Sequence, residues 1–310
     1  MDRGKLNSNL LLLITSTIWG FGFVAQEMGS DHLGPNAFNG TRYSVGVVCL
    51  LIILLLWHRG RAMDGFRSRD WVKASLSAGL FLFFGSLLQQ AGIGYEATGP
   101  GKAGFITGLY VVIVPLLGLT LGHRTNAKMW AGVALATVGL WLLSFNLGNE
   151  QWAIRRGDLL VFFGAFCWAA HVLVLDRFAN RVSSLHLALG QVTVCAGASW
   201  VASALAEPME WASFRAAFLP ALYLGSMSIA VAFTMQIIGQ RKAHPTHASI
   251  IFAMEAVVGV FAGWLILHEQ LTQRELAGCL LMFCGMVLSQ LPVRLIRLGL
   301  TRRANDKPPA

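Results

Sequence analysis

The stretch AGFITGLYVVIVPLLGLTLG, residues 103–122, contains no charged side chain. A helix needs about 20 mostly apolar residues to cross a bilayer, and this run has that length. Such a helix would be apolar on every side and would have no face for water. Further uncharged runs occupy residues 10–26, 43–57 and 74–95. The sequence therefore predicts an all-α integral membrane protein.

Composition and charge agree with a membrane protein. Hydrophobic residues make up 55% of the chain and charged residues only 13%, about half of the share usual in soluble domains. The net charge of +9 could indicate nucleic-acid binding. The basic residues, however, lie in short loops at the ends of the apolar runs, where orientation signals belong. We therefore expect no nucleic-acid partner, and the lipid bilayer as the chain's surroundings.

The five cysteines all fall inside apolar runs, and none forms a C-x-x-C pair. This distribution is typical of small packing residues and suggests neither a disulfide framework nor a metal site. No metal, no cofactor and no catalytic residue are expected. The chain should contain ten spans, at residues 8–27, 37–57, 72–95, 101–122, 128–146, 157–176, 184–206, 218–240, 247–267 and 274–293.

The two halves of the chain resemble each other. Trp19 in the first span matches Trp168 in the sixth, and Pro100 before the fourth matches Pro245 before the ninth. Ala131-Gly132 and Gly139 likewise match Ala277-Gly278 and Gly285. The predicted units are a first five-helix repeat at 8–146, a linker at 147–156, a second five-helix repeat at 157–293 and a cytoplasmic basic tail at 294–310. The first apolar run follows Arg3 and Lys5 as in a signal peptide, but its match with the sixth span indicates a retained helix.

Five spans per repeat is an odd number, so the second repeat must be inverted relative to the first. The loop charges agree: one side of the membrane carries 18 Lys and Arg, including both termini, and the other carries 5. The positive-inside rule then places both termini in the cytoplasm. We expect a multi-pass protein of the inner (plasma) membrane, while its oligomeric state, a homodimer included, stays open.

Inverted repeats are common in secondary transporters, because a movement that closes one side can open the equivalent surface on the other. The predicted partner is therefore a small-molecule substrate. The alternatives are a membrane scaffold that transports nothing and, more remotely, an intramembrane hydrolase. No P-loop or G-x-S-x-G motif is present, and His268-Glu269 lacks the second histidine of H-E-x-x-H. The G-x-G-x-x-G pattern at 99–104 has no strand before it, so it does not indicate a dinucleotide fold.

Motifs in both halves resemble the EamA-type transporters of the drug/metabolite transporter superfamily. The first half carries Trp19-Gly20, Arg42-Tyr43 and the run from Ala103 to Pro115, and the second carries the run from Pro245 to Glu255 and then HEQLT at 268–272. The resemblance covers about residues 8–293. It implies a metabolite carrier, often an exporter of amino acids or related compounds, and no enzyme.

The chain departs from the family pattern at three places. Glu255 is followed by Ala256 where the family often has Glu-Pro, and His123 and His268 stand where it often has Glu after Gly. We interpret these positions as structural.

Glu255 is the sharpest candidate for a functional residue, because a carboxylate near the middle of a span needs a partner, water or a proton. Its repeat counterpart is Tyr110, so the two could face one cavity; a hydrogen bond that only fixes packing is the alternative. Arg42 in the second span could bind an anion bidentately. It could equally clamp a carbonyl or Glu255, or reach for the interface.

Other polar and aromatic side chains within the spans could line the same cavity. Amides in apolar spans need partners from a neighbouring helix or a cavity, and His171 follows Trp168 by three residues, so the two can share a face. Plain packing remains the alternative for the tryptophans. The predicted cavity is lined by Gln90, Gln236, His171, Trp19 and Trp168, together with Glu255, Tyr110 and Arg42.

Overall fold

A computed structural model describes residues 3–58, 66, 68–94, 100–144, 155–208, 210–267 and 272–290. Within these ranges the chain forms helices and no strand. The first half contains α1 (Arg3–Ser30), α2 (Pro35–His58), α3 (Arg69–Gly94), α4 (Pro100–Gly108), α5 (Tyr110–Thr120) and α6 (Ala127–Ser144). The second half contains α7 (Arg156–Phe178), α8 (Ser184–Ala206), α9 (Trp211–Ala216), α10 (Phe218–Tyr223), the π-helical segment η2 (Leu224–Ala232), α11 (Phe233–Gln240), α12 (Pro245–Phe252), α13 (Met254–Leu267) and α14 (Gln273–Gln290).

Eight helical segments of the described chain are long and apolar enough to cross a membrane. They run over Gly4–Ser30, Pro35–Leu56, Arg69–Gly94, Lys102–Thr120, Arg156–Phe178, Ser184–Ala206, Phe218–Gln240 and Pro245–Ala262. The structure thus agrees with an all-α membrane protein and does not confirm the full set of ten spans. The predicted fifth span corresponds to α6, a shorter apolar helix. The predicted tenth, at 274–293, extends past residue 290, where the described residues end.

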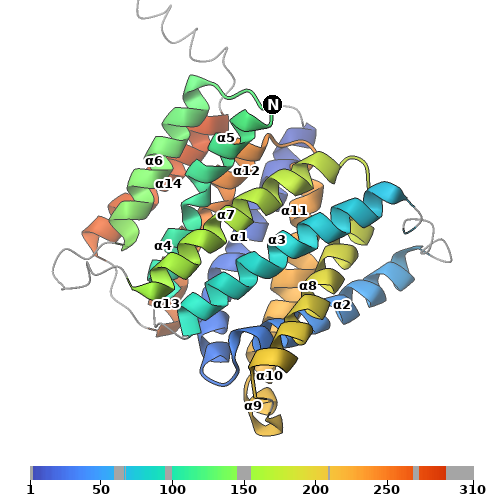
Figure 1. Cartoon of the computed structure of the whole chain (residues 1–310). Coiled ribbons are helices and arrows are strands. Elements are labelled where there is room, and N and C mark those ends of the chain that lie inside the picture. The colour runs from blue at the N-terminus through green and yellow to red at the C-terminus, as the bar shows by residue number, and fades with distance from the viewer. Residues whose placement is uncertain are drawn as a thin grey trace, which may run out of the picture.

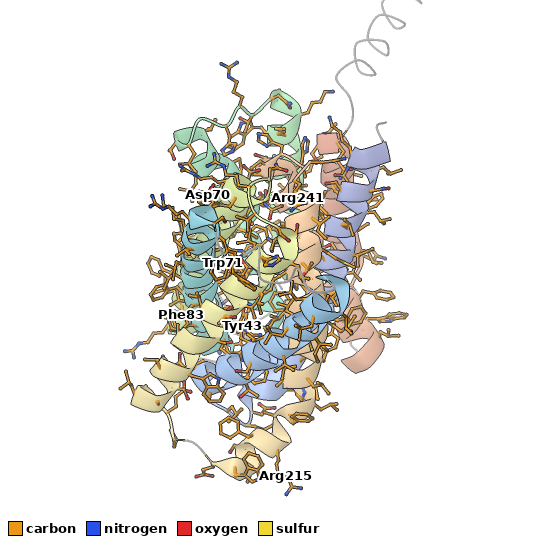
Figure 2. All side chains as sticks on the ribbon, turned by 90° about the vertical axis from the view of Figure 1, so that its right-hand side faces the viewer. Tyr43, Asp70, Trp71, Phe83, Arg215 and Arg241 are labelled. Atoms are coloured by element: carbon orange, nitrogen blue, oxygen red, sulfur yellow. The ribbon has the colours of Figure 1, made fainter. Side chains whose placement is uncertain are left out.

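The long helices run between two opposite ends of the molecule (Figure 1). The N-terminus lies at the upper end of that view, whereas α9 and α10 lie at the lower end. Figure 2 shows Asp70 and Arg241 toward the end that also holds the start of α1, and Arg215 of α9 at the opposite end. Interfacial groups therefore gather at the two ends, and the lipid-facing surface between them is apolar, with exposed Leu55, Leu205 and Leu280.

Local chemistry explains where several helices begin and end. Pro35, Pro100 and Pro245 each occupy the first position of a helix, where the missing N–H costs nothing. The Glu207 carboxylate accepts hydrogen bonds from the backbone N–H groups of Asn36 and Ala37 at 2.9 and 2.7 Å, a favourable place for a negative charge. At the other end of the molecule, Arg241 donates to the carbonyls of Ala179 and Val182, just after α7.

Glycines let α6 and α14 approach closely. A side-chain carbon added at Gly139 would lie 2.7 Å from the Gly278 carbonyl, and one added at Gly285 would lie 2.7 Å from the Gly132 carbonyl. Gly132 therefore faces Gly285, and Gly139, further along α6, faces Gly278, which comes earlier in α14. The two helices are antiparallel. Small residues of this kind permit close packing between helices in a membrane.

Candidate functional site

Two broken helices place Tyr110 and Glu255 opposite each other. The first break, at Leu109, separates α4 from α5, and the second, at Ala253, separates α12 from α13. At both breaks backbone bonds tighten to the three-residue spacing, as in Val112 N–H to Leu109 C=O at 2.9 Å and Ala256 N–H to Ala253 C=O at 3.1 Å. Both residues keep helical backbone angles, with φ −59° and ψ −15° at Leu109 and φ −57° and ψ −18° at Ala253, so each break is a one-residue tightening within a span.

The two side chains meet across the interface between the halves of the chain. The Tyr110 hydroxyl donates a hydrogen bond to the Glu255 Oε1 atom at 3.0 Å, and both residues are buried, at 4% and 5% exposure. The structure thus gives Glu255 a neutral donor as partner rather than a cation. This contact fits both interpretations of Glu255, since a packing bond and a site residue could each make it.

Tyr110 and Glu255 line a small central pocket, with a volume of about 60 Å³, that holds room for a few water molecules. Its walls are largely aromatic. The Trp19 ring lies 5.3 Å from both the Phe233 and the Phe252 rings, and Trp168 stacks on Phe233 at 6.4 Å. Trp19 and Trp168 pack against both large hydrophobic clusters of the protein, so the pocket lies where the two clusters meet. Five of the eight predicted residues line it, namely Trp19, Arg42, Tyr110, Trp168 and Glu255.

The π-helical segment η2 contributes one wall of the central pocket. Ser228 and Ile229 of this segment line the pocket, and the Trp19 indole donates to the Ser228 carbonyl at 3.2 Å. π-Helical turns displace backbone groups from the regular ladder and recur at functional sites. Here the turn supplies an acceptor that fixes the orientation of the Trp19 ring.

An amide network forms another wall of the pocket. Gln89 Nε2 donates to Gln26 Oε1 at 2.9 Å, and Gln89 Oε1 accepts from Trp168 Nε1 at 2.9 Å and from Thr107 Oγ1 at 3.3 Å. Gln90, which the sequence analysis selected, lies outside the pocket and donates to the Gln26 carbonyl at 3.0 Å. The two glutamines are neighbours on α3, so they point about 100° apart.

Arg42 is the most unusual group in the pocket, because it is a buried cation with no buried anion beside it. The side chain is 5% exposed, and no carboxylate in the described part of the chain lies within ion-pair distance of it. Its guanidinium lies over the rings of Phe38 and Tyr43, at 5.5 and 5.4 Å, and its Nε atom has no hydrogen-bond partner there. The predicted clamp on Glu255 is therefore absent from this structure.

His171 and Gln236 are buried but do not line the pocket. The His171 ring bonds through Nε2 to Gln191 Oε1 at 2.9 Å and packs edge-on against Trp168 and Phe233. Gln236 Oε1 has no hydrogen-bond partner among the described residues. Both lie next to the pocket walls rather than in them.

The sequence analysis did not select several pocket residues. Phe23 and Gln26 follow Trp19 at helical spacing, so the three share one face of α1 and all line the pocket. Gln26, a polar amide at the end of that stripe, could have indicated from the sequence that this face of α1 lines a polar pocket. Thr107 carried a weaker signal, since a threonine hydroxyl can satisfy itself within its own helix. No group of three or more His, Cys, Asp or Glu that could hold a metal ion lies in the described part of the chain.

The fold and pocket define a class, a multi-pass membrane protein with a buried polar site between its halves. The family comparison is specific: the model described as "EamA-like transporter family" matches twice, over residues 6–145 and 155–291. The chain belongs to the EamA-like transporter family. It is accordingly a transporter and not an enzyme.

Of three curated relatives, two span nearly the full length of the chain and the third covers part of it. The "Uncharacterized transporter YoaV" of Bacillus subtilis is 27% identical over 289 residues, which cover 90% of this chain and 94% of the relative. The "Probable amino-acid metabolite efflux pump" of Escherichia coli is 21% identical, with 92% and 95% covered. The "Aromatic amino acid exporter YddG" of E. coli is 27% identical over 198 residues, with 60% and 64% covered.

A solved structure shares the fold. It is titled "Crystal structure of protein" and superimposes with a TM-score of 0.76 at 19% identity, covering 93% of this chain and 98% of the other. At this identity the likeness bears on the fold alone.

Proposed function

We propose that the protein exports small zwitterionic metabolites, amino acids with apolar or aromatic side chains, across the inner membrane. The observation that carries this proposal is the central pocket, where an unpaired guanidinium, a carboxyl and aromatic walls converge. Arg42 would bind the substrate carboxylate, since a guanidinium suits a planar carboxylate. Glu255 would receive the amine, and Trp19, Trp168 and Phe233 would surround the side chain. Relatives named for amino-acid and aromatic amino-acid export support the same substrate class.

Alternating access is the proposed mechanism. The pocket of about 60 Å³ is smaller than the roughly 300–1,000 Å³ usual for ligand sites, so substrate needs a wider form of the cavity. The tightened turns at Leu109 and Ala253 are suited to such a movement, because a short 3₁₀ stretch within a helix often marks a hinge and both lie beside the binding groups. The proposal therefore includes a second conformation in which the halves separate around Tyr110 and Glu255.

The proposed architecture is ten spans in two inverted repeats, at 8–146 and 157–293, with a linker at 147–156 and a basic tail at 294–310. The two family matches support the division, and the antiparallel packing of α6 on α14 supports the inversion. Counterpart glycines, Gly132 with Gly278 and Gly139 with Gly285, exchange places in this contact, as a two-fold relation requires.

The proposed topology places both termini in the cytoplasm. Single cysteines at Asp64 and Glu210, in a chain with the five native cysteines replaced by alanine, should react with an impermeant maleimide from opposite faces of the membrane. Glu210 should react from outside. Reaction of both from the same face would contradict the inverted repeat.

The test of function is flux through the purified protein in liposomes. A panel of amino acids should move without ATP, those with aromatic and large apolar side chains fastest. Glu255→Gln keeps shape and hydrogen-bonding capacity but cannot carry the negative charge, so it should insert normally and lose most of the flux or its pH dependence. Unchanged flux and pH profile in Glu255→Gln would assign the residue to packing. A stable partner complex without any flux would instead favour the scaffold.

A further inference from the structure

A second hollow lies away from the central pocket, on the surface between α2 and α3. Its floor is α8, against which both of these helices pack, while α2 and α3 make few contacts with each other. We call it the α2–α3 groove; it lies between Val47 and Leu51 of α2, Val72 and Leu76 of α3, and Gly190 and Thr193 of α8. Its volume is about 450 Å³, well above that of the central pocket.

The lining of the groove is almost entirely hydrocarbon. The Thr193 hydroxyl is already used, because it donates to the Leu189 carbonyl of its own helix at 2.8 Å. Apolar cavities do not hold ordered water, so the groove needs an apolar filling. Leu51, Val72 and Leu76 are each 41–50% exposed and lie within membrane-spanning segments, so the groove opens to the bilayer. The fluid at that surface consists of lipid acyl chains.

The mouth of the groove lies at the interfacial end of α3. Figure 2 shows Asp70 level with Arg241, toward one end of the molecule, and Trp71 below both, toward its middle. Phe66 packs edge-on against Trp71, at 5.0 Å between ring centres, and the Trp71 indole donates to the His186 carbonyl at 2.9 Å. Tryptophan with its polar edge bonded and its ring in an apolar groove is typical of the headgroup level. The groove therefore begins beside the first turn of α3, and a headgroup beside Arg69 would lie at its mouth.

Charge at the mouth favours an anionic headgroup. Arg69 stands three residues before Val72 and seven before Leu76, so it shares their stripe of α3, and it is exposed. Lys73 is also exposed one turn further on, so within the first two turns of α3 two cations outnumber the single acid, Asp70. The first turn of α3 adds the partial positive charge of a helix N-terminus. A phosphate at this level would meet cations above an apolar groove.

We propose that the α2–α3 groove is a binding site for an anionic phospholipid, with one acyl chain between α2 and α3 on the floor of α8 and its headgroup beside Arg69. The floor of the groove is closely packed, because a side chain at Gly190 would collide with Ser75 Oγ. This packing suits a slender ligand such as a lipid acyl chain. This site is independent of the proposed transport. It predicts retention of a lipid whether or not the protein carries amino acids.

Native mass spectrometry of the full-length protein tests the site, after exchange into detergent with phosphatidylglycerol or phosphatidylcholine of equal chain length. The wild type should retain one phosphatidylglycerol preferentially. Thr193→Trp fills the groove and should lower retention at least about tenfold, whereas Leu280→Trp, on an exposed face of α14, should not. Equal retention in Thr193→Trp and the wild type, or none in the wild type, would overturn the proposal, as would a dimer contact that covers the groove.

Arg69→Gln tests the headgroup contact separately from the acyl-chain contact, because it removes the charge and leaves the groove intact. Since one basic residue near an anionic surface contributes about 1 kcal/mol, the preference for phosphatidylglycerol should fall about fivefold. Arg215→Gln is the matched control, because it removes one exposed charge at the opposite end of the molecule (Figure 2). Equal effects of the two variants would indicate net charge rather than a site.

Discussion

At the scale of single residues, the proposed function assigns the selectivity of the pocket to Arg42. A buried guanidinium without a carboxylate is costly in a membrane protein, and here the rings of Phe38 and Tyr43 offset part of that cost. The tyrosine is itself fixed by a hydrogen bond between its hydroxyl and Ser86 Oγ. The arrangement leaves the guanidinium pre-oriented and still able to bind an anion.

Substitution of Arg42 by glutamine should therefore weaken binding of carboxylate-bearing substrates by roughly tenfold or more, because a charge-assisted hydrogen bond contributes about 1.5–3 kcal/mol. Concentration-dependent flux in liposomes measures this. Amine analogues that lack the carboxylate are the internal control and should be affected far less. Equal loss for both classes, with a lower folded yield, would make Arg42 a structural cation.

His244 makes one helix start sensitive to pH. Its Nδ1 atom accepts a hydrogen bond from the Thr246 N–H at 3.2 Å and so caps α12. Burial, and then repulsion from His123, lowers the pKa of His244 below its ordinary value. The unfolded chain then binds this proton more readily than the folded one, so the free energy of unfolding falls as the pH drops below about 6.5.

His244→Asn keeps a capping acceptor but does not titrate. The thermal midpoint in detergent should consequently fall less between pH 7 and pH 5 in this variant than in the wild type. The free energy of unfolding that the variant retains at low pH should be on the order of 1 kcal/mol, which is the contribution of a helix cap. His32→Asn, in an exposed turn, is the control and should keep the wild-type profile. An unaltered slope in His244→Asn would exclude this histidine as the cause.

At the scale of helices, close packing of α6 on α14 depends on glycine. Gly139→Ala would bring a carbon within 2.7 Å of a backbone carbonyl, which cannot rotate away. We expect a destabilisation of about 1–3 kcal/mol, as for other overpacked interfaces, read as a lower midpoint in detergent. Gly197→Ala on α8 meets nothing within 4 Å and should stabilise slightly, since alanine favours a helix. A neutral Gly139→Ala would show that the two helices can separate freely.

The sequence predicted an all-α membrane protein and the proximity of Tyr110 and Glu255. It predicted poorly which way individual side chains face on their helices. The Tyr110–Glu255 pair followed from repeat alignment, because counterpart residues must lie at similar depth. The sequence analysis selected Gln90 as a pocket residue, whereas Gln89 lines the pocket. Only the tertiary contacts of α3 decide which of two adjacent amides faces the pocket. The π-helical segment η2 left no pattern in the sequence, since its register depends on packing against α1 and α2.

At the scale of the whole molecule, an ion pair and a histidine–carboxylate hydrogen bond join the described part of the first half to α7, one near each of its ends. Lys102 pairs with Asp158 near the start of α7, and His123 Nε2 lies 3.1 Å from Asp176 Oδ2 near its end. Figure 1 places the end of α7 toward the N-terminus of the chain and its start toward the other end of the molecule. Alternating access requires the halves to part at one end at a time, so each contact should hold one face closed.

Removing the two contacts should bias the protein in opposite directions. With a Ser228→Cys reporter in the pocket wall of an otherwise cysteine-free chain, Lys102→Ala should raise labelling by an impermeant maleimide from the face opposite the N-terminus. His123→Ala should raise it from the N-terminal face. A partly exposed ion pair or hydrogen bond of this kind contributes up to about 1 kcal/mol, so we expect increases of about two- to fivefold. Arg215→Ala, which removes a charge outside both contacts, should change neither rate. Faster labelling from the same face in both variants would show that the contacts stabilise the fold as a whole and do not control access to the pocket.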